Sequence, residues 1–248
     1  MSRLILSEWI KFRTVNTTTW CLFALALPIL GVAGLVAVDE KPRGPLPVEW
    51  LVTHSQFGLV PGQLAVVVLA VTAVGSEYST GTIRSSLTAV PWRARWLAAK
   101  AAVLALVVLT AGVLLSFAAF AVVRVSVPEV SGSVLDPDVL RALVGAGLYL
   151  GALAVLGLGV ATMLRSTTGG VVAMFTLILL VPVLIAPTPL RRATAYLPGV
   201  APPSAGWPVT RVGQTVDGLG TWTGYGVLCA WAVAAMAGAV WALSRRDA

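Results

Sequence analysis

The sequence predicts an all-α integral membrane protein with six transmembrane helices, an N-terminal interfacial amphipathic helix and a short cytoplasmic coupling helix between spans two and three. Two observations lead to this fold class. Of the 248 residues, 58% are hydrophobic and only 11% are charged, whereas soluble globular domains carry about 25% charged residues. The apolar residues also fall into six runs of about 20 residues, the length that crosses a bilayer as a helix. We therefore expect residues 1–248 to form a single transmembrane domain.

The six predicted spans are apolar throughout. They cover residues 21–38, 57–75, 101–123, 142–164, 169–186 and 224–243. No small-residue cleavage site follows the first run, so we expect this run to remain as a membrane anchor. Pro182 lies inside the fifth span, where we expect a kink. Within these bounds the spans contain no Asp, Glu, Lys, Arg or His.

The net charge of +7 is distributed as membrane topology predicts. The chain has no dense basic face and no nucleic-acid-binding motif, so we expect no nucleic-acid partner. Lys and Arg are enriched on the cytoplasmic side of membrane proteins. If the N-terminus lies inside, ten basic residues lie inside and seven outside. We therefore expect a multi-pass protein of the plasma membrane with both termini in the cytoplasm.

Residues 3–15 have an amphipathic pattern that precedes the first span. The apolar side of the helical wheel holds Ile5, Leu6, Trp9, Ile10 and Phe12. The polar side holds Arg3, Ser7, Glu8 and Lys11, while Arg13 falls on the apolar side and can snorkel. A basic amphipathic segment with a Trp is typical of a helix that lies in the membrane interface. The alternative is a cytoplasmic tail whose pattern arose by chance.

Residues 75–100 form the longest polar and basic stretch, GSEYSTGTIRSSLTAVPWRARWLAAK. We expect a short helix from Ile83 to Leu87, which Pro91 ends. Because both ends of the stretch continue into membrane spans, such a helix can transmit movement to them. We expect Glu77 and Arg84 to be exposed and to make charge-assisted contacts with a soluble partner. The alternative is a basic loop that only sets the topology.

Small residues at helical spacing predict close packing in two spans. Gly147 and Gly151 are four residues apart in the fourth span, as are Gly226 and Ala230 in the last. Small residues let the backbones of membrane helices approach each other closely. The alternative is that the chain is simply rich in Gly and Ala.

The motifs that are missing exclude several kinds of chemistry. The sequence contains no G-x-x-x-x-G-K-[ST] loop, so we do not expect the chain to hydrolyse ATP itself. It has one histidine, His54, and neither H-E-x-x-H nor G-x-S-x-G. We therefore expect no catalytic residue, no metal site and no cofactor bound by this chain.

Two stretches resemble the membrane permease subunits of type-2 ATP-binding-cassette (ABC) transporters. In that family S-E-W-x-K-x-[RK]-T precedes the first helix, and E-Y-x-x-G-T/M-I-R follows the second, with a Pro, basic residues and a Lys further on. The matching residues here are Ser7, Glu8, Trp9, Lys11, Arg13 and Thr14, then Glu77, Tyr78, Gly81, Thr82, Ile83 and Arg84, then Pro91, Arg93, Arg95 and Lys100. These specific matches cover about the first 100 residues.

The resemblance implies a permease that pairs with a second copy or a paralogue and with two separate ATPase subunits, which would use ATP and Mg. The ATPase-coupling residues would be Glu77, Tyr78, Gly81, Thr82, Arg84, Pro91, Arg93 and Arg95. The interfacial helix, with Glu8, Trp9, Lys11 and Arg13, would also touch the ATPase. We expect an exporter, and the apolar spans favour a hydrophobic or amphipathic cargo that moves between the two permeases.

Two other functions remain open from the sequence. A self-sufficient channel or ion-coupled carrier would transport without an ATPase, and the uncharged spans count against it because such carriers place ionisable groups near the midplane. A membrane enzyme would need a nucleophile and a base in a wet cavity. The predicted spans offer hydroxyl groups but no acid, base or metal ligand.

Overall fold

The computed structural model describes residues 2–39, 48–82, 92–127, 135–185, 187–198 and 221–245. Within these ranges the chain contains helices and no strands, and six of the helical segments are long and apolar enough to cross a membrane. The helices are α1 (Ser2–Thr14), α2 (Asn16–Asp39), α3 (Val48–Ser55), α4 (Leu59–Ser79), α6 (Arg93–Ser126), α7 (Pro137–Leu164), α8 (Thr167–Phe175), the π-helical η1 (Thr176–Leu180), α9 (Val181–Ile185), the 3₁₀ helix η2 (Pro189–Tyr196) and α10 (Thr221–Arg245). The protein is a multi-pass membrane protein.

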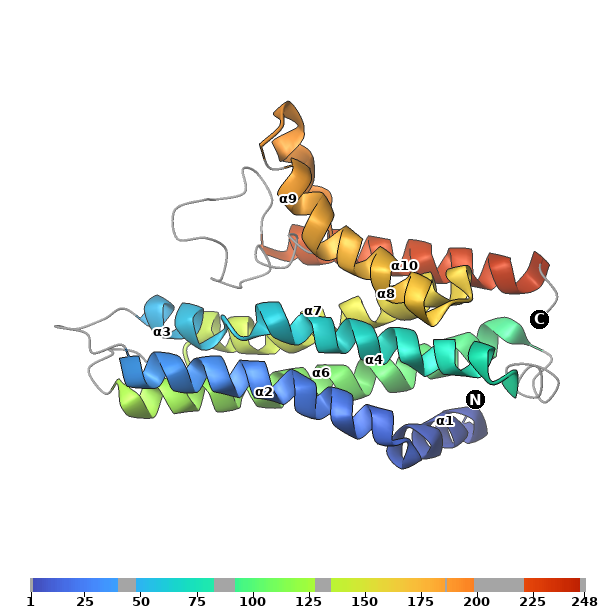
Figure 1. The fold of residues 1–248 in the computed structure, drawn as a ribbon. Coiled ribbons are helices and arrows are strands. Elements are labelled where there is room, and N and C mark those ends of the chain that lie inside the picture. The colour runs from blue at the N-terminus through green and yellow to red at the C-terminus, as the bar shows by residue number, and fades with distance from the viewer. Residues whose placement is uncertain are drawn as a thin grey trace.

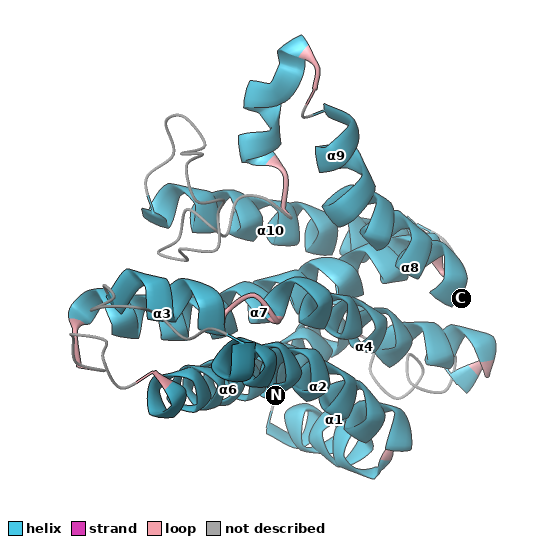
Figure 2. Ribbon diagram, turned by 60° about the vertical axis from the view of Figure 1, so that its left-hand side comes forward, coloured by secondary structure: helices cyan, strands magenta, loops and turns pink. Residues whose placement is uncertain are grey.

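The long helices form an elongated bundle with α7 at its centre. Helix α7 packs against α4, α6 and α10, and α2 packs against α4 and α6 (Figure 1). Among the six candidate spans, the one formed by α7 is the most buried within the chain. The two termini lie at the same end of the bundle (Figure 1), and Figure 2 shows α1 on the side away from α8, α9 and α10.

The prediction of six membrane-length helices is confirmed, but several of them are longer than the apolar runs. Helix α4 continues to Ser79, and α6 begins at Arg93, before the predicted start at residue 101. The statement that the spans lack ionisable residues therefore holds only for the narrower predicted bounds, because α4 carries Glu77 and α6 carries Lys100. The helix predicted from Ile83 to Leu87 lies outside the described residues.

The fifth span is not a regular α-helix. In η1 the Val181 N–H donates to the Thr176 carbonyl, five residues earlier, as in a π-helix. Pro182 follows directly, and its ring nitrogen has no hydrogen to donate to the carbonyl four residues back. The π-helical turn and the proline are therefore adjacent in the sequence. Helices α8 and α9 run obliquely to the other helices (Figure 1).

The small residues predicted to pack do so in α7 but not in α10. A Cβ atom on Gly147 would lie 2.3 Å from Val113 Cγ2 and 2.7 Å from the Leu109 carbonyl oxygen, both in α6. A Cβ atom on Gly151 would lie 3.3 Å from Leu109 Cβ. Gly226 and Ala230 are exposed, and within the described structure a Cβ atom on Gly226 would meet no atom within 4 Å.

Replacing Gly147 by Ala should therefore separate α6 from α7. Because the new methyl group would overlap backbone atoms as well as a side chain, we expect the free energy of unfolding to fall by about 1–3 kcal/mol. Thermal unfolding of the detergent-solubilised protein measures this loss. Gly226→Ala adds the same methyl group in open space and serves as the matched control, so equal stability of the two variants would contradict the packing explanation.

Candidate functional site

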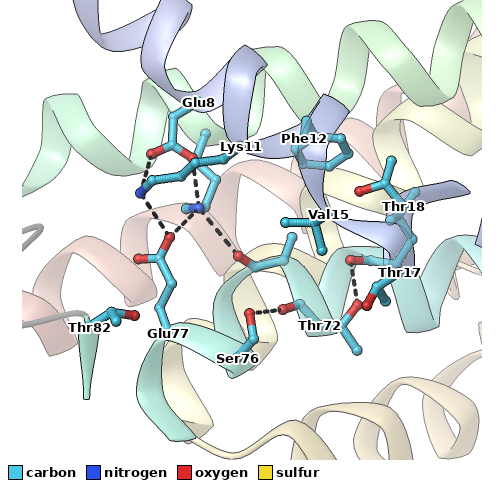
Figure 3. Close-up of a pocket in the computed structure, with 13 residues that line it drawn as sticks. Glu8, Lys11, Phe12, Val15, Thr17, Thr18, Thr72, Ser76, Glu77 and Thr82 are labelled. Atoms are coloured by element: carbon cyan, nitrogen blue, oxygen red, sulfur yellow. Dashed lines mark hydrogen bonds and ion pairs between the residues drawn. The ribbon is translucent and has the colours of Figure 1, made fainter. Parts of the chain in front are cut away.

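Four charged side chains meet where α1, α4 and α6 converge (Figure 3). The Lys100 ammonium lies 2.8 Å from Glu8 Oε2 and 2.8 Å from Glu77 Oε1. The Lys11 ammonium lies 3.3 Å from Glu8 Oε1 and 3.3 Å from Glu77 Oε1. We call Glu8, Lys11, Glu77 and Lys100 the charge cluster. Its two carboxylates and two ammonium groups balance each other.

Helix α1 turns Glu8 and Phe12 toward the protein, whereas Ser7, Lys11 and Arg13 are exposed. Glu8 and Phe12 lie one turn apart and are both buried, and α1 packs against α6 and α2. The opposite side of α1 is apolar and exposed, with Ile5, Leu6, Trp9 and Ile10. A short helix with four exposed large apolar side chains is typical of a helix whose apolar side meets lipid.

Three of the four members of the charge cluster are almost completely removed from solvent. Glu8 and Lys100 are each 3% exposed and Glu77 is 8% exposed. Charges at such depth are tolerated only when they are paired and hydrogen-bonded. Lys100 meets this condition with the two carboxylates, the Ala73 carbonyl at 3.3 Å and the Trp96 ring, whose centroid is 5.4 Å away. The second carboxylate oxygen of Glu77, Oε2, is also buried but has no hydrogen-bond partner among the described residues.

The expectation that Glu77 is exposed is wrong. Helix α4 continues past residue 75 by one further turn, and this turn sets the direction of the Glu77 side chain. Glu77 then lies one turn after Ala73, on the side of α4 that faces Lys100 of α6. A carboxylate held there is bound inside this chain and is not presented to a soluble partner.

Lys11 is the half-exposed member of the charge cluster. Partial burial lowers its pKa, but the carboxylates of Glu77 and Glu8 raise it by more, so the pKa lies above the ordinary value of 10.5. A group whose pKa rises on folding stabilises the folded state fully below its unfolded pKa. The contribution of Lys11 to the stability of the folded state is therefore complete at neutral pH and is lost only as the pH rises above about 10.5.

The other residues predicted for coupling fall into two groups at the same end of the bundle. Gly81, Thr82 and Arg95 are exposed at the two ends of the connection between α4 and α6, and Arg95 lies over the Trp92 ring at 4.5 Å. Gly81 has a φ of 70°, which favours glycine. We call Ser79, Thr80, Gly81, Thr82, Trp92 and Arg95 the exposed rim.

Tyr78 and Arg93 connect this end of the bundle to other helices. The Arg165 guanidinium, between α7 and α8, lies 5.8 Å from the centre of the Tyr78 ring. Arg93 donates a hydrogen bond to the Leu243 carbonyl near the end of α10. Trp9 and Arg13 are exposed on α1 outside the charge cluster. Arg84 and Pro91 lie outside the described residues.

The sequence prediction placed Lys100 in a motif but not among the site residues. A signal for it was present, because Lys100 directly precedes the third predicted span, Glu77 follows the second by two residues, and Glu8 lies in the segment before the first. Charges at membrane depth pair with one another. Applying this rule to the three residues predicts the ion pairs that the structure contains.

A cavity of about 530 Å³ opens beside the charge cluster (Figure 3). Its lining residues come from α1, α2, α4 and α6 and the segments that join them: Glu8, Lys11, Phe12, Val15, Thr17, Thr18, Leu69, Thr72, Ala73, Ser76, Glu77, Thr82 and Lys100. Charged and hydroxyl groups therefore share the cavity with apolar side chains.

Comparisons with known proteins assign no family to the chain. No protein-family model matches it, and no curated protein matches its sequence. Among the described residues, no three His, Cys, Asp or Glu side chains lie close enough together to hold a metal ion.

Replacing Lys100 by Met should destabilise the fold strongly. The variant keeps the length of the side chain but leaves two buried carboxylates without their 2.8 Å donor. Removing one partner of a buried ion pair costs about 3–5 kcal/mol, and we expect a loss of this size in chemical unfolding.

The matched control is Arg141→Met. It breaks the Arg141–Asp138 pair at 2.6 Å, whose side chains are 40% and 76% exposed, and such a surface pair contributes at most about 1 kcal/mol. Similar stability losses in the two variants would show that the charge cluster does not hold the helices together.

Proposed function

We propose that this chain is the permease subunit of an ATP-driven type-2 ABC transporter of the export type. It would form the translocation path with a second copy or a paralogue, and two separate ATPase subunits would supply ATP hydrolysis. The observation that carries the proposal is the charge cluster, which fastens α1 to both helices that flank the connection between Ser79 and Arg93.

The contacts at this end of the bundle suit the transmission of force. Lys100 ties α6 to α4 and α1 at the same time, and Arg93 ties the start of α6 to the end of α10. A load applied to the connection between α4 and α6 would act on helices that cannot separate without exposing buried charges. The load would then move them as one unit, which is what an external motor requires.

The exposed rim is the surface offered to the ATPase. Arg95 provides a cationic group, and Trp92, Gly81 and Thr82 lie on the same rim. Arg supports charge-assisted, bidentate contacts with carboxylates of a partner. Glu77 takes an internal role instead, as the residue that connects the exposed rim to α1 and α6.

The membrane arrangement follows the same proposal. An even number of spans puts both termini on the same side of the membrane. The distribution of basic residues favours the cytoplasmic side of a plasma membrane for both termini. The exposed small residues of α10, Gly226 and Ala230, leave room for a second permease. The apolar surfaces of the spans suit a hydrophobic or amphipathic cargo.

The test is ATPase stimulation by the chain in lipid nanodiscs. We expect the gene next to that of this chain to encode a Walker A-containing ATPase, whose hydrolysis rate should rise when it assembles with the permease. Arg95→Glu reverses a charge on the exposed rim without touching the charge cluster. We expect it to lower the stimulation about fivefold, which corresponds to ~1 kcal/mol of lost contact energy.

The control for this experiment is Arg141→Glu, near the start of α7 and away from the end that Arg165 follows. This variant should insert normally into the membrane and leave the ATPase stimulation unchanged. An ATPase that neither binds nor responds to the unmodified chain would contradict the proposal. So would transport by the chain alone in liposomes, the behaviour of a self-sufficient carrier.

A further inference from the structure

We propose that the cavity beside the charge cluster binds the phosphoethanolamine headgroup of a membrane lipid. This ligand carries a phosphate and a primary ammonium group a short distance apart, and two acyl chains. The cavity offers a cationic and hydroxyl-bearing side for the phosphate, an unpaired carboxylate oxygen for the ammonium group, and apolar residues for the start of the chains. The inference does not depend on an ATPase partner.

The phosphate side is formed by Lys11 and the start of α2. The Lys11 side chain is 48% exposed, so its ammonium can serve a ligand in addition to the two carboxylates. Thr17 and Thr18 line the cavity in the first turn of α2, and within the described structure their hydroxyl groups make no hydrogen bond. The N-terminus of a 24-residue helix adds its positive dipole end.

The ammonium side is formed by Glu77. One carboxylate oxygen accepts from Lys100 and Lys11, whereas Oε2 is buried and, in the part of the chain that the structure describes, has no hydrogen-bond donor. Figure 3 shows this second oxygen pointing away from the ion pairs, on the side of Thr82, which also lines the cavity. A buried carboxylate oxygen left without a donor is costly, and a primary ammonium supplies a charged one.

The position of the cavity favours a lipid over a soluble headgroup. Phe12, Val15 and Leu69 give it an apolar wall. Helix α1 covers one side and turns the exposed Ile5, Leu6 and Trp9 outward, which places it at the level of the lipid headgroups. A headgroup that enters from the adjacent leaflet would keep its acyl chains beside the lipid-facing helices.

Native mass spectrometry of the full chain can test this assignment. The delipidated protein is incubated with equal amounts of dioleoyl phosphatidylethanolamine and dioleoyl phosphatidylcholine, which have the same phosphate and acyl chains. The choline headgroup has no N–H to donate. We expect the chain to retain the ethanolamine lipid about tenfold better, the ratio expected for one charge-assisted hydrogen bond. Equal retention of the two lipids by the unmodified chain would overturn the proposal.

Two variants separate the two sides of the cavity. Glu77→Gln removes the negative charge and should abolish the preference for ethanolamine over choline, whereas Thr18→Val should weaken the binding of both lipids and leave their ratio unchanged. A folded Glu77→Gln variant that keeps the preference, or a Thr18→Val variant that binds both lipids normally, would contradict the assigned contacts. If Glu77→Gln does not fold, the lipid preference of the unmodified chain and the binding of both lipids by Thr18→Val still test the proposal.

Two further arms complete the experiment. Arg141→Gln, far from the cavity at the start of α7, should retain both lipids like the unmodified chain, and a loss there would show that retention does not report on the cavity. Glycerophosphoethanolamine, which has the same headgroup but no acyl chains, should bind far more weakly than the lipid. Equal binding would overturn the assignment of a membrane lipid in favour of a soluble ligand.

Discussion

The Lys100 ammonium is the group on which this end of the molecule depends. It lies between two carboxylates that come from different helices, Glu8 of α1 and Glu77 of α4. Both carboxylates are buried, and a buried charge is costly without a partner, so α1, α4 and α6 must stay together for the charges to be paired. Apolar packing alone would let α1 lie elsewhere on the membrane surface, whereas the shared lysine specifies one position.

The same interaction explains why a polar stretch can follow α4 without loosening the bundle. Glu77 anchors the last turn of α4, and the residues after it are exposed. At the other side of the connection, Trp96 and Lys100 are buried in α6 while Trp92 and Arg95 are not. The boundary between buried and exposed residues is therefore sharp on both helices. A partner that bound the exposed rim would therefore act on residues that continue directly into α4 and α6.

Close contacts between backbones hold the middle of the bundle. Gly147 brings α7 against α6, and Gly159 brings α7 against Ala235 of α10, where a Cβ atom would lie 2.8 Å from the Ala235 carbonyl carbon. Two buried polar pairs add to this packing: Tyr149 donates to Gln63 across α7 and α4, and Gln56 donates to Ser116 of α6 at 2.7 Å. In lipid, such contacts replace the hydrophobic effect as the source of helix association.

Composition and periodicity by themselves determined the class of the protein and the number of long helices, because the length and polarity of an apolar run are local properties that the bilayer selects directly. They also placed Glu8 and Lys11 on an N-terminal amphipathic helix and Glu77 just after the second span. Only the tertiary structure decided what these residues do. Lys100 is 92 residues from Glu8 and 23 from Glu77 in the sequence, and whether they meet depends on how far α4 and α6 continue past their apolar runs. That extension is set by pairing between helices, which no single segment encodes, and it turned Glu77 from an expected surface contact into a buried partner.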